Sequence, residues 1–320
     1  MYDAVKKSVE LISNLCEDFN LTVWRQKKYN IKTLKNILRK FQKMNHSTSK
    51  DEAKRLKRKD EIKTACEAFI EISKNLRDRV SADMINLEII STDPMLEIKF
   101  KEINHYITHV DRQLDQVQRR IINEETIPHD EKVFSIFEEY TERLSKGKAG
   151  ISQELGLNVC VIEDQFGFIL NHRIMQSEVD KTIAVPFTKK TKELFPNLNS
   201  LSFDKGFWSP ANRDELEEII DKVVLPKKGK LAAKDKEREY SPEFKEAKHQ
   251  HSAVESGINA LENHGLDRCP DRSLNSFKRY ISYAVLGRNL QILGNIIQEK
   301  EIARKKRSEK MKQFKRKRAA

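Results

Sequence analysis

Residues 198–225 read LNSLSFDKGFWSPANRDELEEIIDKVVL, and this stretch decides the class of fold. Its first six residues contain Leu198, Leu201 and Phe203, and they predict a short strand that ends on Asp204. Ser209 as an N-cap and Pro210 at the first helical position predict a helix directly afterwards. The apolar run 223–225 predicts a second strand. A strand–helix–strand unit of this kind is typical of an α/β fold.

The residues before this unit predict a hairpin. Two apolar segments, 158–162 and 168–174, flank the turn residues 163–167. A helix is expected from Val185 to Phe195, and the run 133–137 predicts a further short strand. Antiparallel strands followed by strands joined through helices predict a mixed sheet.

The front of the chain has a different period. From Met1 to about Ile122, apolar residues recur three and four apart, with very few glycines or prolines. The pattern changes after Pro128, which predicts a domain boundary. We therefore expect an all-α helical segment over 1–128, an α/β core over 129–297 and a basic tail over 298–320.

The tail and the overall charge favour a polyanionic partner. Residues 299–320 carry eleven Lys and Arg against three acids, and the whole chain has a net charge of +12. Such a tail is expected to be disordered when free and to bind nucleic-acid backbones in a salt-dependent way. A tail that only keeps the protein in solution is the alternative.

The cysteines and the hydropathy predict a soluble cytoplasmic protein. Four cysteines stand far apart, without a paired spacing, and no signal-peptide pattern follows Met1. No apolar run reaches the roughly 18 residues needed to cross a bilayer. We therefore expect no membrane contact.

Two carboxylates stand where metal-dependent phosphodiester chemistry needs them. Asp204 ends a predicted strand, and Glu255 lies in a predicted helix that begins at Pro242. A pair of Mg²⁺ or Mn²⁺ ions activates the attacking oxygen and stabilises the leaving oxygen, and such hard cations prefer carboxylate ligands. The alternatives are a turn residue for Asp204 and a solvent-facing charge for Glu255.

The surroundings of both acids resemble a known family. Residues 202–210, SFDKGFWSP, resemble the second-aspartate motif of insertion-sequence transposases, and residues 251–261, HSAVESGINAL, resemble their third-acid helix. The likeness continues through 223–229, 265–271 and 277–280, and covers essentially the whole chain. The chain thus resembles the ISNCY group of bacterial DDE transposases.

This resemblance implies an RNase H-like core whose first strand is missing, with the helical front inserted after that strand. It makes Asp204 and Glu255 the second and third metal ligands of an enzyme that cleaves and transfers DNA strands, with double-stranded DNA as partner. It also implies a homo-oligomer and a nucleoid-associated location in the bacterial cytoplasm. The lysines near the motifs either contact DNA phosphate or are plain surface residues: Lys205, Lys227, Lys228 and Lys230.

Two further residues are candidates for DNA contact. Related transposases place Tyr and Arg upstream of the catalytic Glu, whereas Lys248 and His251 occupy those positions here. Contact of His251 with phosphate is therefore an expectation that departs from the family pattern. Trp24 is expected either to stack on a base or to pack between helices.

The resemblance implies that the first catalytic Asp is absent. In the family this Asp lies on a strand that precedes a Leu/Phe-x-Asp-Ala segment, and the chain is expected to begin within that segment, at Met1–Ala4. Glu138 and Glu139 are the substitutes to consider, while Asp164 is interpreted as a turn residue. We thus expect a transposase fragment that is inactive alone. The alternative is a non-catalytic DNA-binding, assembly or inhibitor protein derived from a transposase.

Overall fold

A computed structural model describes residues 1–45, 51–91, 93–145, 153–251, 253–266 and 268–319. The chain divides into two compact units, Met1–Glu139 and Tyr140–Ala320. The division falls eleven residues after the expected boundary at 128. In the described residues, no helix is both long and apolar enough to span a membrane.

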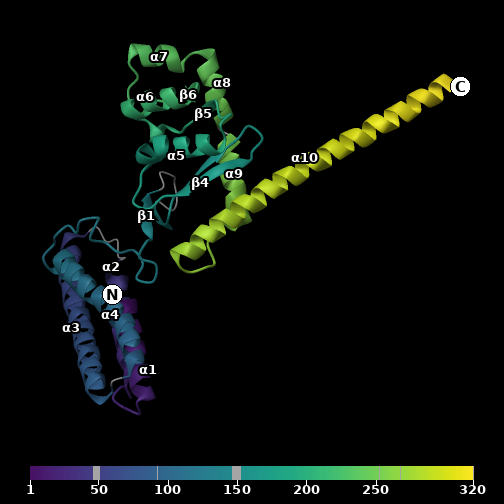
Figure 1. The fold of residues 1–320 in the computed structure, drawn as a ribbon. Coiled ribbons are helices and arrows are strands. Elements are labelled where there is room, and N and C mark those ends of the chain that lie inside the picture. The colour runs from purple at the N-terminus through teal and green to yellow at the C-terminus, as the bar shows by residue number, and fades with distance from the viewer. Residues whose placement is uncertain (46–50, 92, 146–152, 252, 267, 320) are drawn as a thin grey trace. The chain divides into compact units, whose positions relative to one another are not determined.

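The first unit packs four helices: α1 (Tyr2–Asp18), α2 (Lys27–Asn45), α3 (Glu52–Ile90) and α4 (Pro94–Val117) (Figure 1). Asp51 and Asp93 cap α3 and α4 by accepting hydrogen bonds from the backbone N–H groups of the first turn. The apolar stripes of α1, α3 and α4 meet in one core, in which Ile12 and Val80 are fully buried. The predicted helical front is thus present.

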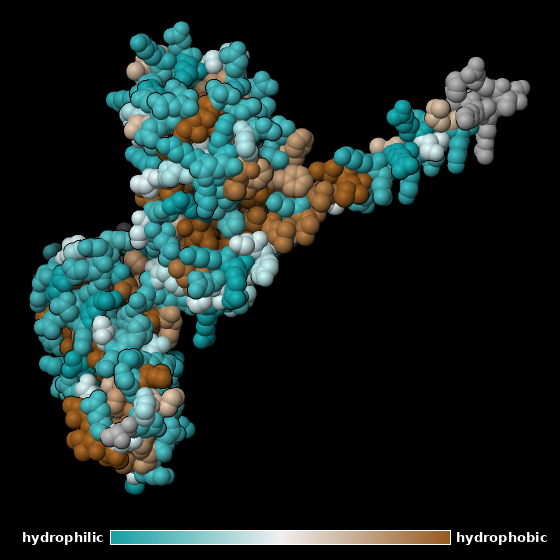
Figure 2. All heavy atoms as spheres, viewed as in Figure 1, coloured by the Kyte–Doolittle hydropathy of each residue, from teal (hydrophilic) through white to brown (hydrophobic). Residues whose placement is uncertain are grey.

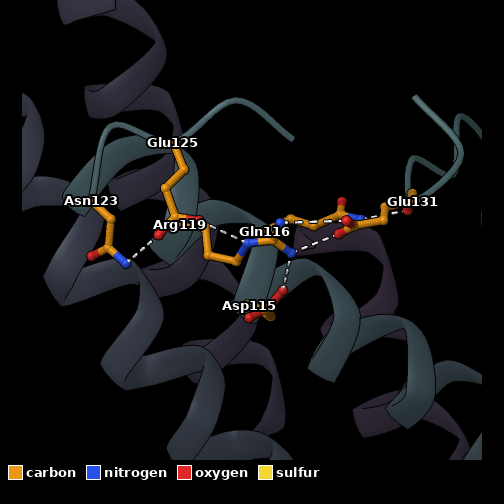
Figure 3. A network of polar contacts seen from close by, with 6 residues as sticks. All are labelled: Asp115, Gln116, Arg119, Asn123, Glu125 and Glu131. Atoms are coloured by element: carbon orange, nitrogen blue, oxygen red, sulfur yellow. Dashed lines mark hydrogen bonds and ion pairs between the residues drawn. The ribbon is translucent and has the colours of Figure 1, made fainter. Parts of the chain in front are cut away.

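A short π-helix, η1 (Gln118–Ile122), ends α4 and is followed by an irregular segment. Arg119 holds this segment in place. Its guanidinium reaches Glu131 at 2.6 Å, Asp115 at 3.0 Å and Glu125 at 3.1 Å, as Figure 3 shows. Gln116 adds a hydrogen bond to the Glu131 carbonyl. The strand predicted over 133–137 is wrong, because these residues are irregular and Ile136 packs into the helical core.

The second unit holds three separate two-stranded sheets. The strands β1 (Glu142–Ser145) and β2 (Gln153–Gly156) pair antiparallel, as do β3 (Val159–Glu163) and β4 (Ile169–Ile174). The strands β5 (Ser200–Ser202) and β6 (Lys222–Val224) pair in parallel. The α/β class is confirmed, and so is the hairpin. Among the described residues the strands stay in separate pairs, so the expected single mixed sheet is not confirmed.

The helices of this unit follow the predicted order. They are α5 (Asp180–Leu194), α6 (Pro210–Ile219), α7 (Ala233–Glu239), α8 (Pro242–His251), α9 (Ala253–Leu261) and α10 (Leu274–Ala319), with short turns η2 (Lys205–Phe207) and η3 (Glu262–Leu266). Ser209 caps α6 by accepting from Asn212 N–H at 3.1 Å, as predicted. Ser252 and Asp267, which belong to the quoted motifs, lie outside the described residues.

Helix α10 continues through the basic tail, where the sequence predicts disorder. Before the tail it exposes a row of large apolar side chains at alternating spacings of three and four, visible as the brown patch along this helix in Figure 2. They are Tyr283, Leu286, Leu290, Leu293 and Ile297. Beyond them the described surface of α10 is mainly hydrophilic.

The packing of the first unit predicts a large loss of stability for Ile12→Ala. Removing this fully buried side chain leaves a cavity, and we expect the free energy of unfolding to fall by about 3 kcal/mol. The chain has two tryptophans, so a Trp208→Phe background leaves Trp24, buried in the same core, as the single fluorescent reporter of urea unfolding. Leu56→Ala, at a side chain that is 61% exposed, is the control and should change stability by less than about 0.5 kcal/mol. Equal midpoints for the two variants would contradict this core.

Candidate functional site

Asp204 is fixed at the carboxyl end of β5. The preceding residue, Phe203, is buried and donates its N–H to the Val224 carbonyl of β6 at 2.9 Å. The chain then turns outward, and Asp204 becomes the N-cap of η2 by accepting from Lys205 N–H at 2.7 Å. The Asp204 side chain is consequently exposed at a strand end, as predicted.

His251 lies within range of the charges of both Asp204 and Glu255. The imidazole lies on the last turn of α8, and its Nδ1 is 2.9 Å from Ser202 Oγ on β5. Burial lowers the pKa of His251, whereas the negative charges of Asp204 and Glu255 both raise it. The structure therefore brings the two predicted acids to the surroundings of one imidazole.

A third carboxylate, Asp180, joins this group. It is the first residue of α5 and lies against Gly206, where any side chain would overlap the Asp180 carboxylate. Burial and then the Asp204 charge raise the pKa of Asp180, while the Lys228 ammonium lowers it. Two acids that repel each other are an arrangement that a bound cation would stabilise.

Sequence reasoning missed Asp180 because it placed the start of this helix at Val185. The available signal was an acid in the first turn of a helix that follows a hairpin, where the helix dipole favours a negative charge. That signal is weak, because surface helices commonly begin with an acid. Its position beside Gly206 arises from tertiary packing.

The predicted basic residues differ in their surroundings. Lys205, Lys228 and Lys230 are all exposed, and the charge of Lys228 lowers the pKa of Asp180. Lys227 instead forms an ion pair with Asp235, and its ammonium lies 5.6 Å from the centre of the Trp208 ring. Lys228 is thus a lysine whose charge acts on the acids, and Lys227 is already paired within the protein.

Trp24 packs between helices. Only 3% of its surface is exposed, and the Arg79 guanidinium lies 4.2 Å from its ring centre. The ring is therefore not available to stack on a base in this structure. Its place in the helical core corresponds to the packing alternative.

The proposed substitutes for a first acid lie in other surroundings. Asp164 accepts hydrogen bonds from Phe166 N–H at 2.8 Å and Phe168 N–H at 2.9 Å, which confirms it as a turn residue. Glu138 and Glu139 belong to the first unit, whereas Asp204 and Glu255 belong to the second.

Glu139 lies beside two histidines of α4. Its Oε1 is 2.7 Å from Nε2 of His109, outside hydrogen-bond geometry, and 4.0 Å from Nδ1 of His105. The three side chains offer ligand atoms within 4.8 Å of one another. Two histidines and a glutamate are a ligand set that suits Zn²⁺ better than Mg²⁺. Sequence reasoning considered Glu139 as an acid but overlooked the two histidines one helical turn apart.

The arrangement around His251 predicts opposite effects of charge and burial on its titration. Asp204→Asn and Glu255→Gln should each lower the pKa of His251 further, because each removes a negative charge that stabilises the imidazolium. NMR titration of histidine ring resonances would measure both shifts, with His251→Gln used to assign the signal. Asp271→Asn, at an exposed acid of the same unit, should leave it unchanged. If neither substitution moved the His251 titration, the two acids would not share its surroundings.

Comparison with known proteins adds no relative: the chain matches no family model, no curated protein and no solved structure. Function is therefore argued from the residues and their geometry.

Proposed function

We propose that this chain belongs to a bacterial DDE transposase of the ISNCY group, a mobile-element enzyme that cleaves DNA and transfers its strands. The observation that carries the proposal is that the charges of Asp204 and Glu255 both act on His251, since both acids lie in the motifs that resemble this family. An RNase H-like core is part of the proposal. Its supports are the antiparallel hairpin β3–β4 and the parallel pair β5–β6, joined through helices.

The carboxylates fit a site for Mg²⁺ or Mn²⁺. Asp204 projects from a strand end, Glu255 from a helix, and Asp180 stands beside Asp204 with a raised pKa. Carboxylate oxygens suit these cations, which when bound supply an activated attacking oxygen and stabilise the leaving oxygen. Asp204 and Glu255 would hold the cations, and Asp180 would supply the third carboxylate of the site. His251, bonded to Ser202, would position the acids around it.

Double-stranded DNA is the proposed substrate, met in the bacterial cytoplasm and nucleoid. Lys228 stands next to the acids, where an ammonium group can hold a backbone phosphate near the reaction centre. The basic end of α10 offers a second, sequence-independent contact, because its described Lys and Arg side chains are exposed. Lys205 and Lys230 can add to the first contact.

A homo-oligomer is the proposed assembly. The apolar row of α10, from Tyr283 to Ile297, has the spacing of a helix-packing seam and is exposed in the single chain. Such a row is stabilised when a second helix covers it. This surface therefore supports self-association through α10.

The second candidate is a non-catalytic DNA-binding or assembly protein derived from a transposase, which binds and inhibits the full enzyme. One observation favours it. Within the described ranges, the three-residue group of His, Cys, Asp or Glu with metal-ligand spacing is His105, His109 and Glu139, and it excludes Asp204 and Glu255. Metal binding at Asp204 separates the two candidates.

We expect Mn²⁺ to bind with Asp204 and Glu255 as ligands. Titration followed by Mn²⁺ electron paramagnetic resonance should show that Asp204→Asn and Glu255→Gln each weaken binding by at least about tenfold, the loss that even outer-shell partners cause. The measurement belongs in a His105→Gln background, so that the cluster at His109 does not contribute. Glu218→Gln, at an exposed acid of α6, is the matched control.

The same variants test catalysis. Any nicking of supercoiled plasmid that the wild-type chain shows in Mn²⁺ should disappear in Asp204→Asn and in Glu255→Gln. It should persist in the Glu218→Gln control. Robust cleavage that survives both substitutions would overturn the assignment of these acids. Unaltered Mn²⁺ affinity in both variants would favour the non-catalytic candidate.

We expect the end of α10 to contribute phosphate contacts. Replacing Lys305, Lys306 and Arg307 by Gln should reduce the salt slope of duplex binding by about 2.7 if all three contact phosphate, since each contact contributes about 0.9. Fluorescence anisotropy with unrelated duplexes would show a similar loss for each sequence. The control removes the same charge from the first unit through Lys74→Gln, Lys99→Gln and Lys101→Gln. Equal losses for both triple variants would mean that only net charge matters.

A further inference from the structure

The two histidines beside Glu139 occupy one face of α4. Positions four apart on a helix are neighbours on its surface, so His105 and His109 point to the same side. Their rings are nearly perpendicular, with centres 4.8 Å apart. His105 is exposed, whereas only 1% of His109 is exposed. One imidazole therefore lies inside the helical core and the other at its surface.

His109 is a buried imidazole that lacks a hydrogen-bond partner. Within the described residues, neither its Nδ1 nor its Nε2 makes a hydrogen bond. Buried polar groups normally have a partner, because burying one without a partner is costly. The Nε2 is aimed at the Glu139 carboxylate, 2.7 Å from Oε1, but without the geometry of a hydrogen bond. A cation bound by both atoms would satisfy the nitrogen lone pair and the carboxylate charge together.

Packing carries Glu139 to this face of α4. Glu139 ends an irregular segment, in which Ile136 is buried in the helical core. The Phe137 ring lies 6.2 Å from the ring of Tyr106 on α4, and the Tyr106 ring lies 5.1 Å from that of His105. The carboxylate therefore reaches the histidines because the backbone before it is anchored to the helical core.

The three ligand atoms have spacings that suit a zinc ion. Zinc holds four ligand atoms tetrahedrally at about 2.1 Å, which puts these atoms about 3.4 Å apart. The Glu139 oxygen lies 2.7 Å from one histidine nitrogen and 4.0 Å from the other, and all three atoms lie within 4.8 Å of one another. Rotation of the exposed His105 and Glu139 side chains can even out these distances. Imidazole nitrogens suit Zn²⁺, whereas Mg²⁺ prefers oxygen ligands in an octahedron.

The first half of the irregular segment is held by exposed ion pairs. Arg119 binds Glu125 and Glu131 there (Figure 3). The three side chains are between 27% and 46% exposed, and ion pairs in contact with water stabilise a fold only weakly. Metal coordination at Glu139 would add a stronger link at the other end of the segment.

We propose that His105, His109 and Glu139 bind one Zn²⁺ ion, which fastens the segment 123–139 to α4. Three protein ligands leave the fourth position of the tetrahedron to a water molecule. A link between residues far apart in the chain also restricts the unfolded state, so zinc stabilises the first unit. All three ligands belong to that unit, and none is an acid of the proposed DNA site. Zinc binding here is therefore independent of the proposed DNA chemistry.

Zinc affinity is measured on the full chain with Asp204→Asn and Glu255→Gln in place, so that the acids of the second unit do not compete. Titration against a zinc-binding dye is expected to show one tight site in this parent chain. His105→Gln, His109→Gln and Glu139→Gln should each weaken it by at least about tenfold. The side chains of His105 and Glu139 are 45% and 54% exposed, so these two variants keep the fold even if loss of the buried imidazole disturbs it.

Matched substitutions at exposed positions of the same unit are the controls. His129→Gln removes an imidazole and Glu88→Gln removes a carboxylate, and both should keep the affinity of the parent chain. A large excess of Mg²⁺ should not displace the zinc. X-ray absorption at the zinc edge should show nitrogen and oxygen ligands at about 2.0–2.1 Å and no sulfur at about 2.3 Å, which excludes binding by the four cysteines.

Unfolding measures the fastening itself. In the Trp208→Phe background, where Trp24 reports on the first unit, zinc should raise the urea midpoint of the parent chain and leave that of His105→Gln and Glu139→Gln unchanged. Absence of a tight site, a sulfur ligand, or a zinc affinity that none of the three ligand substitutions lowers would overturn the proposal. Zinc binding that leaves the midpoint of the parent chain unchanged would overturn it as well, because the ion would then not fasten the segment.

Discussion

The packing of Phe203 against Ala184 and Val185 is the contact on which the second unit depends. It fixes β5 to α5, and the chain must then leave the core at the next residue. That exit places Asp204 at the strand end and Gly206 against Asp180. The group of acids is therefore a by-product of how one aromatic side chain is buried. A smaller residue at position 203 would loosen the core, and Asp204 and Asp180 would both be displaced.

Local patterns predicted the elements of this unit well. The hairpin, the strand before Asp204 and the Ser209 cap each depend on residues close in sequence, and the structure confirms them. The start of α5 was missed, because Val179 offers no side-chain cap to mark it. The separation of the sheets was also missed. Whether two strand pairs share an edge is decided by residues far apart in the chain.

The candidate site shows the same division. The positions of Asp204 and Glu255 follow from motifs, and the effect of both charges on His251 depends on the packing of α8 against β5. Asp180 is brought in by tertiary contact alone. Conversely, Trp24 is a residue type that could stack on a base, but its burial in the helical core decides its role. A sequence pattern indicates which side chains are available, and the fold decides which of them meet.

The length of α10 has a consequence for how far the protein can reach. From Ile281, buried beside the hairpin, to Lys312 the helix rises by about 47 Å at 1.5 Å per residue. A duplex advances about 3.4 Å per base pair, so this distance corresponds to about 14 base pairs. On the proposed function, basic side chains near Lys312 would contact a bound duplex more than one helical turn away from Ile281. On the proposed function, the length of α10 would set how much of a bound duplex the protein covers.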